Sequence, residues 1–227
     1  MNCSLKHEYP HIMYPSGPSF GGNQMKEAHL PTANLGCGLV AVADTLSYLC
    51  RTNGASIPQI PYESTISQET YTKYLNRLRR RMPILSLLGG IPAMELVWAL
   101  RYYSKKAHLS YSFRWGVPSR KMYGVIAKML SQDLPVIVSV GMAFPYFISK
   151  AGVKYYEKRP NGNLVVAGTV RGHYMTITGL MDVDERAYLR VSSWGMEYYI
   201  DFEEYLNFAR KKSNLLFTNI LYISKRR

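Results

Sequence analysis

Apolar residues recur at spacings of three and four in four segments of the chain, which is the pattern of helices that bury one face. The first segment, residues 38–51, is apolar over so broad a stripe that we expect its helix to be largely buried. The other three segments are residues 67–82, 93–105 and 119–132. The pattern therefore predicts helices mainly in the first half of the chain.

The second half alternates between polar and apolar residues or runs apolar over short stretches, as strands do. An Asn-Gly pair at residues 161–162 predicts a hairpin within residues 153–170. A second hairpin is predicted from residue 174 to residue 193, with its turn at 182–186. Further strands are predicted at residues 108–115, 134–140, 198–200 and 215–224, and Asp201 is expected to cap a helix.

Helices followed by antiparallel strands are the order of an α+β domain. We expect one domain over residues 1–227, helix-rich over 1–107 and mostly strand over 108–227. The first 35 residues carry prolines and glycines that interrupt any periodicity, and we expect them to be irregular.

The net charge of +13 comes from lysines and arginines in both halves, with one local run at Arg77, Arg79, Arg80 and Arg81. Either this run is a solvated helical face, or it attracts an acidic partner. No phosphate-binding loop, zinc finger or RNA-binding motif accompanies the charge, which argues against nucleic acid. No apolar stretch is long enough for a transmembrane segment, and no signal segment opens the chain, so we expect a cytoplasmic protein.

Cys37 is the strongest candidate for chemistry among the three cysteines. It lies between Gly36 and Gly38, directly before the first long apolar helix. A helix N-terminus favours the thiolate, which is the nucleophilic form, and the flanking glycines leave room for a substrate carbonyl. The alternative is a small buried side chain near a helix start. Cys50 fits an apolar pattern and is expected to be structural, and no cysteine or histidine spacing predicts a metal site.

A nucleophilic cysteine needs a base, and His173 is the candidate because it follows a glycine at the start of a predicted strand. A protonated imidazole there would also favour the thiolate. The hairpin turn near Asp182 should lie roughly 30 Å from His173 at about 3.3 Å per residue. The return strand brings Ser192 back toward His173, so Ser192 or a backbone carbonyl is expected to orient the imidazole.

These residues resemble the papain-like cysteine peptidases, in the bacterial branch that is similar to bacteriocin leader peptidases. The resemblance rests on Gly-Cys-Gly-Leu-Val-Ala at residues 36–41, Gly-His-Tyr at 172–174 and Ser-Ser-Trp-Gly at 192–195. It implies a papain-like fold, with the catalytic cysteine at a helix start and an antiparallel sheet toward the C-terminus. It also implies that Trp194 covers the site.

The chain departs from that family at two positions. Ser192 stands where the family has an orienting Asn or Asp, and Pro31 stands where it has an oxyanion-binding Gln. Gln24 and Asn34 are the replacement candidates for the oxyanion donor.

The resemblance implies a hydrolase, a peptidase or amidase, that forms an acyl intermediate on Cys37 with His173 as base and needs no cofactor. The substrate would be a peptide or another amide. Two alternatives stay open within the same fold: an acyltransferase, and a binding protein whose catalysis is impaired. A basic nucleic-acid-associated module is a third alternative.

Overall fold

The computed structural model describes residues 2–58, 60–84, 90–143 and 149–226. The chain forms two compact units. The unit that we call the sheet unit comprises Met1–Leu5, Gly116–Ser192 and Glu197–Tyr222. The other, which we call the helix unit, comprises Lys6–Trp115, Ser193–Met196 and Ile223–Arg227.

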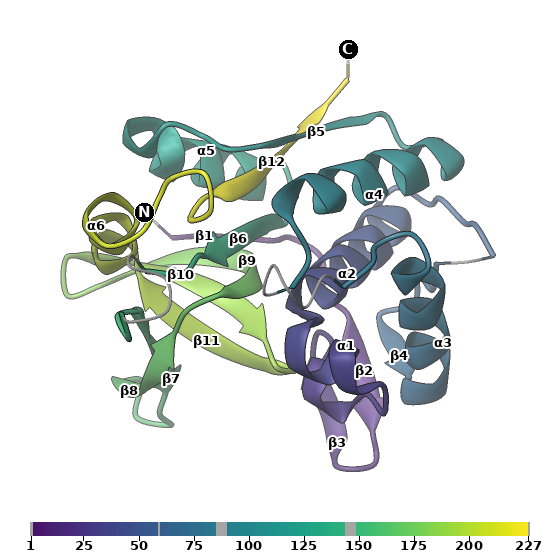
Figure 1. The fold of residues 1–227 in the computed structure, drawn as a ribbon, viewed down its shortest axis with the longest axis horizontal. Helices are drawn as coiled ribbons and strands as arrows, with labels where there is room; N and C mark the ends of the chain where they lie inside the picture. Colours follow the sequence, from purple (N-terminus) through teal and green to yellow (C-terminus); the bar gives the residue numbers. More distant parts are fainter. Residues whose placement is uncertain (1, 59, 85–89, 144–148, 227) are drawn as a thin grey trace. The chain divides into compact units, whose positions relative to one another are not determined.

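The helix unit is organised around α2 (Cys37–Thr52), against which α3 (Gln68–Arg79) and α4 (Ala93–Lys106) pack (Figure 1). Every residue of α2 from Cys37 to Cys50 is buried. A helix that is buried on all sides is a core element rather than an amphipathic surface helix, as the broad apolar stripe predicts. The short helix α1 (Leu30–Leu35) precedes α2, and β5 (Tyr111–Trp115) packs on α4.

The prediction that the first 35 residues are irregular was wrong. Strand β2 (His11–Tyr14) pairs antiparallel with β3 (Gly17–Phe20) and parallel with β4 (Thr65–Ser67), and a 3-10 helix, η1 (Gln24–Lys26), follows. The prolines are compatible with this sheet because Pro18 lies in β3, an edge strand. Short strands of four residues leave too few alternating positions for a period to be visible.

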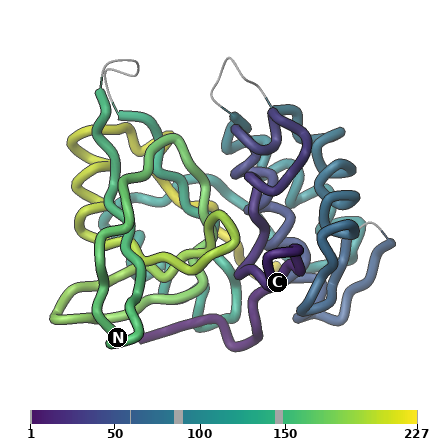
Figure 2. The backbone as a smooth tube through the Cα atoms, turned by 90° about the horizontal axis from the view of Figure 1, so that it is seen from below, coloured from purple at the N-terminus to yellow at the C-terminus, as the bar shows by residue number. Residues whose placement is uncertain are grey.

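The sheet unit contains a large antiparallel sheet, with strands in the order β12-β6-β9-β10-β11-β7-β8. Its strands are β6 (Val136–Val140), β7 (Val153–Lys158), β8 (Leu164–Val170), β9 (His173–Val183), β10 (Arg186–Ser193), β11 (Met196–Asp201) and β12 (Ile220–Lys225). Helix α5 (Ser119–Ser131) packs on β6 and β9. Helix α6 (Phe202–Lys211), drawn in yellow in Figure 2, lies beside β7, where Tyr156 donates a hydrogen bond to Glu204 at 3.2 Å.

The predicted α+β class is confirmed, as are both predicted hairpins, β7–β8 and β9–β10. The Asp201 cap is confirmed too, because its carboxylate accepts hydrogen bonds from the backbone N–H groups of Glu203 and Glu204. Strand β1 (Cys3–Ser4) was not predicted; it pairs with β9 in the sheet unit.

A buried carboxylate, Asp44, connects three segments of the helix unit. It lies in the middle of α2 and accepts hydrogen bonds from the Tyr71 hydroxyl of α3 at 2.6 Å and from the Gly22 N–H at 2.9 Å. A side chain at position 22 would overlap the Tyr71 ring, so glycine is required for this close approach. Desolvation raises the pKa of Asp44 to about 6, although these hydrogen bonds lower it.

We predict that Asp44 makes the stability of the protein depend on pH. The pKa of Asp44 is about 6 in the folded state and 3.8 in the unfolded state. The contribution of Asp44 to the free energy of unfolding is therefore complete below pH 3.8 and is lost as the pH rises through 6. The free-energy difference between wild type and Asp44→Asn in urea unfolding should therefore shrink from pH 4 to pH 7. The exposed Glu63→Gln is the control, and an equal trend in that variant would contradict the assignment to Asp44.

Candidate functional site

Cys37 is the first residue of α2, and the backbone at Gly36 puts it there. Gly36 ends α1 and caps α2, and its N–H donates to the Thr32 carbonyl at 2.9 Å. A Cβ at position 36 would overlap that carbonyl oxygen, so a larger residue would force the two helices apart. The N-cap residue, Gly36, has no side chain with which to cap the N-terminus of α2. The Cys37 side chain is therefore at a helix start whose N–H groups and positive dipole end favour a thiolate.

The other two cysteines lie in different surroundings. Cys50 is completely buried near the end of α2, and burial raises the pKa of its thiol to about 12, which keeps it protonated. Cys3 lies in β1 of the sheet unit, with its Sγ 3.9 Å from the Ala127 carbonyl oxygen. None of the three forms a disulfide. Cys50 thus has the properties of a structural residue, as predicted.

His173 is the first residue of β9 and pairs with Val140 of β6. It is buried, and burial lowers the pKa of its imidazole to about 4. Because desolvation disfavours the cation, burial argues against the protonated imidazole that the sequence led us to expect, and the protonation state of His173 stays a prediction. A neutral imidazole can accept a proton, which is the property that a general base needs.

The register of β9 and β10 bears directly on Ser192. Ser192 pairs with Thr176, three residues after His173. Because side chains alternate between the two faces of a strand, Ser192 shares a face with Thr176, and His173 has the opposite parity. A bulge opposite Arg190 and Val191 causes this change of face. Without the bulge, Ser192 would pair with Ile177, whose side chain is on the same face as that of His173. The orienting role of Ser192 stays a prediction, and this register argues against it.

The two candidates for the oxyanion donor differ in their surroundings. Gln24 is buried in η1, and its Nε2 donates to the Ala33 carbonyl of α1 at 3.1 Å. Asn34 lies in α1 with an exposed side chain. The Gln24 amide thus already connects η1 to the helix before Cys37. Their role as oxyanion donors stays a prediction.

Trp194 and Gly195 form the turn between β10 and β11, both with positive φ, 49° and 76°. A tryptophan at positive φ is sterically disfavoured, so the surrounding structure must hold this turn in place. The Gly195 carbonyl accepts a hydrogen bond from the Phe20 N–H at 2.7 Å, within the helix unit. Sequence reasoning missed this connection to β3; the only local signal was a glycine between two predicted strands, which is typical of a tight turn. That Trp194 covers a site stays a prediction.

Cys37, Gln24, Asn34 and Trp194 belong to the helix unit, whereas His173 and Ser192 belong to the sheet unit. The pairing of Cys37 with His173 therefore stays a prediction. Among the described residues, no group of three or more His, Cys, Asp or Glu side chains could hold a metal ion.

We predict that Gly195→Ala destabilises the protein more than Gly54→Ala does. Both glycines have positive φ, which costs an alanine on the order of 1–2 kcal/mol. A Cβ at position 195 would also press on Ser19 and Asn23 at 3.0 and 3.1 Å, whereas position 54 has open space. Urea unfolding of the two variants measures the difference. Equal losses would show that Ser19 and Asn23 yield to the added methyl group.

None of the helices in the described ranges is long and apolar enough to cross a membrane. Comparison with known proteins finds no family model and no curated protein that matches this chain.

Proposed function

We propose that this protein is a cysteine-dependent hydrolase of peptides or other amides, with Cys37 as the nucleophile and His173 as the base. The observation that carries the proposal is the position of Cys37 as the first residue of a buried helix whose N-cap residue is a glycine. Burial favours the neutral imidazole of His173, which has a nitrogen that can accept a proton, although a pKa of about 4 lies below the value that makes the most efficient base at neutral pH.

The reaction would proceed in two steps. In the first, the Cys37 sulfur attacks the substrate carbonyl carbon as the imidazole takes the thiol proton. The carbon–nitrogen bond then breaks, the imidazolium gives its proton to the amine, and an acyl thioester remains on Cys37. In the second, the imidazole takes a proton from water as the resulting hydroxide adds to the thioester carbonyl carbon. The carbon–sulfur bond then breaks, the imidazolium returns its proton to the sulfur, and the carboxylic acid leaves.

Backbone N–H groups in the first turn of α2 would stabilise the oxyanion in both steps. Preorganised backbone N–H donors of this kind can stabilise an oxyanion without a Gln side chain, at a rate about 100-fold or more below that of a hole with one donor more. The proposed site could therefore act in a chain that has Pro31 at the position of the family's Gln. Gln24 remains the side-chain candidate because it connects η1 to α1.

The first test is acylation by p-nitrophenyl acetate. We expect a burst of nitrophenolate and, by peptide mass spectrometry, an acetyl group on Cys37. His173→Ala should slow the acetylation about 100-fold or more, since it removes the general base. The wild-type rate should decrease as the pH falls through about 4, where the imidazole becomes protonated.

Cys50→Ala and Cys37→Ala are the matched controls, because each removes one thiol from the same helix. The burst should persist in Cys50→Ala and disappear in Cys37→Ala. A burst that survives in Cys37→Ala, or acetylation of Cys37 that is as slow as that of Cys50, would overturn the proposal. Addition of glycine amide as an acceptor tests acyl transfer, because an acyltransferase would release acetylglycine amide instead of acetate.

The second test concerns the partner of the imidazole. Because the register puts Ser192 on the face of Thr176, we expect Ser192→Ala to keep acetylation within about 3-fold of wild type. Ser193→Ala is the comparison, since the adjacent residue of β10 has the opposite parity. A loss of about 10-fold or more in Ser192→Ala alone would show that Ser192 does orient the base.

A further inference from the structure

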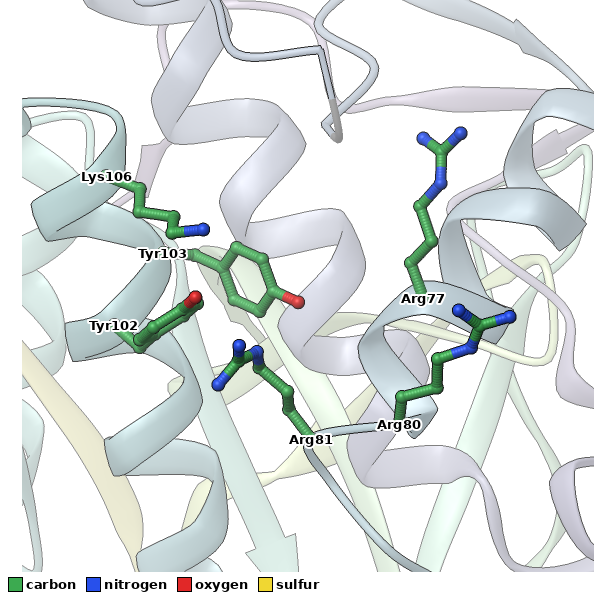
Figure 3. Close-up of a pocket in the computed structure, with 6 residues that line it drawn as sticks. All are labelled: Arg77, Arg80, Arg81, Tyr102, Tyr103 and Lys106. Carbon is green, nitrogen blue, oxygen red and sulfur yellow. The ribbon is translucent and has the colours of Figure 1, made fainter.

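A second candidate site lies entirely within the helix unit, in a pocket of about 490 Å³. Six side chains line it, four of them basic: Arg77, Arg80, Arg81, Tyr102, Tyr103 and Lys106. Figure 3 shows the head groups of Arg81 and Lys106 beside the two tyrosine rings, with Arg77 and Arg80 extending from the α3 side. The C-terminal ends of α3 and α4 thus bring cations from two segments to one cavity.

The positive charge of this pocket is not balanced by the protein. None of the described Asp or Glu side chains forms an ion pair with any of its four cations. The C-terminal ends of the two helices supply roughly half a negative charge each, which is far less than four positive charges. A cavity with this unbalanced charge favours a multiply charged anion.

The tyrosines hold two of the cations close together. The Arg81 guanidinium carbon lies 4.1 Å from the centre of the Tyr102 ring, and the Lys106 Nζ lies 4.9 Å from it. A hydrogen bond from Lys106 and the charge of Arg81 lower the pKa of Tyr102, although desolvation opposes them. Tyr103 packs edge-on against Tyr102, with ring centres 5.1 Å apart, and is itself buried. The Tyr102 ring thus attracts the exposed head groups of Arg81 and Lys106 to the same place.

We propose that this pocket binds a small molecule through a chain of two or three phosphate groups. The planar guanidinium fork matches the oxygens of a phosphate in a two-bond geometry, and the lysine adds a point charge. The pocket volume lies within the usual range for small ligands, roughly 300–1,000 Å³. In Figure 3 Arg81 and Lys106 point toward the tyrosine rings, whereas Arg77 and Arg80 point away from them, so Arg81 and Lys106 would make the central contacts to a compact anion. An extended polymer would instead need a stripe of charge along the surface.

A solubilising role explains this arrangement less well. Charge that only keeps a protein soluble can be spread over the surface, where like charges repel least. Here two cations lie over one aromatic ring, which attracts each of them and so holds two like charges near one another, where an anion could contact both.

The test is titration calorimetry of inorganic triphosphate into the full chain at about 150 mM salt, an ionic strength that screens distant surface charge. We expect saturable binding with one site. Loss of three charged contacts in Arg80→Gln/Arg81→Gln/Lys106→Gln should raise Kd about 100-fold or more. ATP then separates the sources of the phosphate chain: affinity equal to that of triphosphate means that the phosphates alone are recognised, and tighter binding identifies a nucleotide.

The matched control is Arg120→Gln/Lys121→Gln/Arg159→Gln. Like the pocket variant, it removes two arginines and one lysine, but from exposed positions in the sheet unit. Its Kd for triphosphate should stay within about 3-fold of wild type, because the salt screens the effect of distant surface charges on binding. An equal loss in both triple variants would overturn the pocket, as would absence of triphosphate binding. The proposal would also be overturned if a 20-nucleotide single strand bound more tightly than triphosphate and if both triple variants weakened its binding equally. An extended polyanion surface behaves in this way.

Thermal unfolding checks that the pocket variant is folded. If it is not, Arg81→Gln alone, with an expected loss of about 10-fold, replaces it. Acetylation of Cys37 in the pocket variant should stay unchanged, so failure of this inference and failure of the proposed hydrolase are distinguishable.

Discussion

The helix unit depends on a polar interaction in the middle of its most apolar element. Asp44 would be costly in a helix that is buried on all sides if its carboxylate had no donors. The Tyr71 hydroxyl and the Gly22 N–H supply them, and so attach α3 and the segment before η1 to the same turn of α2. This arrangement fixes how the neighbouring elements surround α2, the helix that begins at Cys37.

Much of the fold follows from local pattern. The apolar spacing of residues 38–51, the Asn161–Gly162 turn and the Asp201 cap each depend on neighbours within a few positions, and all three occur in the structure. The strands before residue 35 and the pairing of β1 with β9 depend on partners far along the chain. No local period reports such partners, because register is a property of two segments at once.

In the candidate site too, the features that depend on neighbouring residues were predictable from the sequence, and those that depend on distant segments were not. Gly36-Cys37-Gly38 before an apolar helix was enough to predict a cysteine at a helix start, and the structure has α2 begin at that residue. The face of Ser192 was not predictable, since one extra residue in β9 changes the parity of everything beyond the bulge. The lowered pKa of His173 was missed for a related reason, because it results from burial by residues that are distant in sequence. The basic pocket needed the ends of α3 and α4 together, and only the arginine run was visible in the chain.

The pairing of β1 with β9 makes the first residues part of the central sheet. Cys3 is opposite Leu180, Ser4 is opposite Gly179, and the Leu5 N–H donates to the Thr178 carbonyl at 3.0 Å. The edge of β9 beyond β6 is thus covered by a segment that lies far before β9 in the sequence. Until β9 is made, β1 has no strand to join. A chain shortened by its first five residues would present bare β9 backbone, and an uncovered strand edge of this kind is a template for self-association.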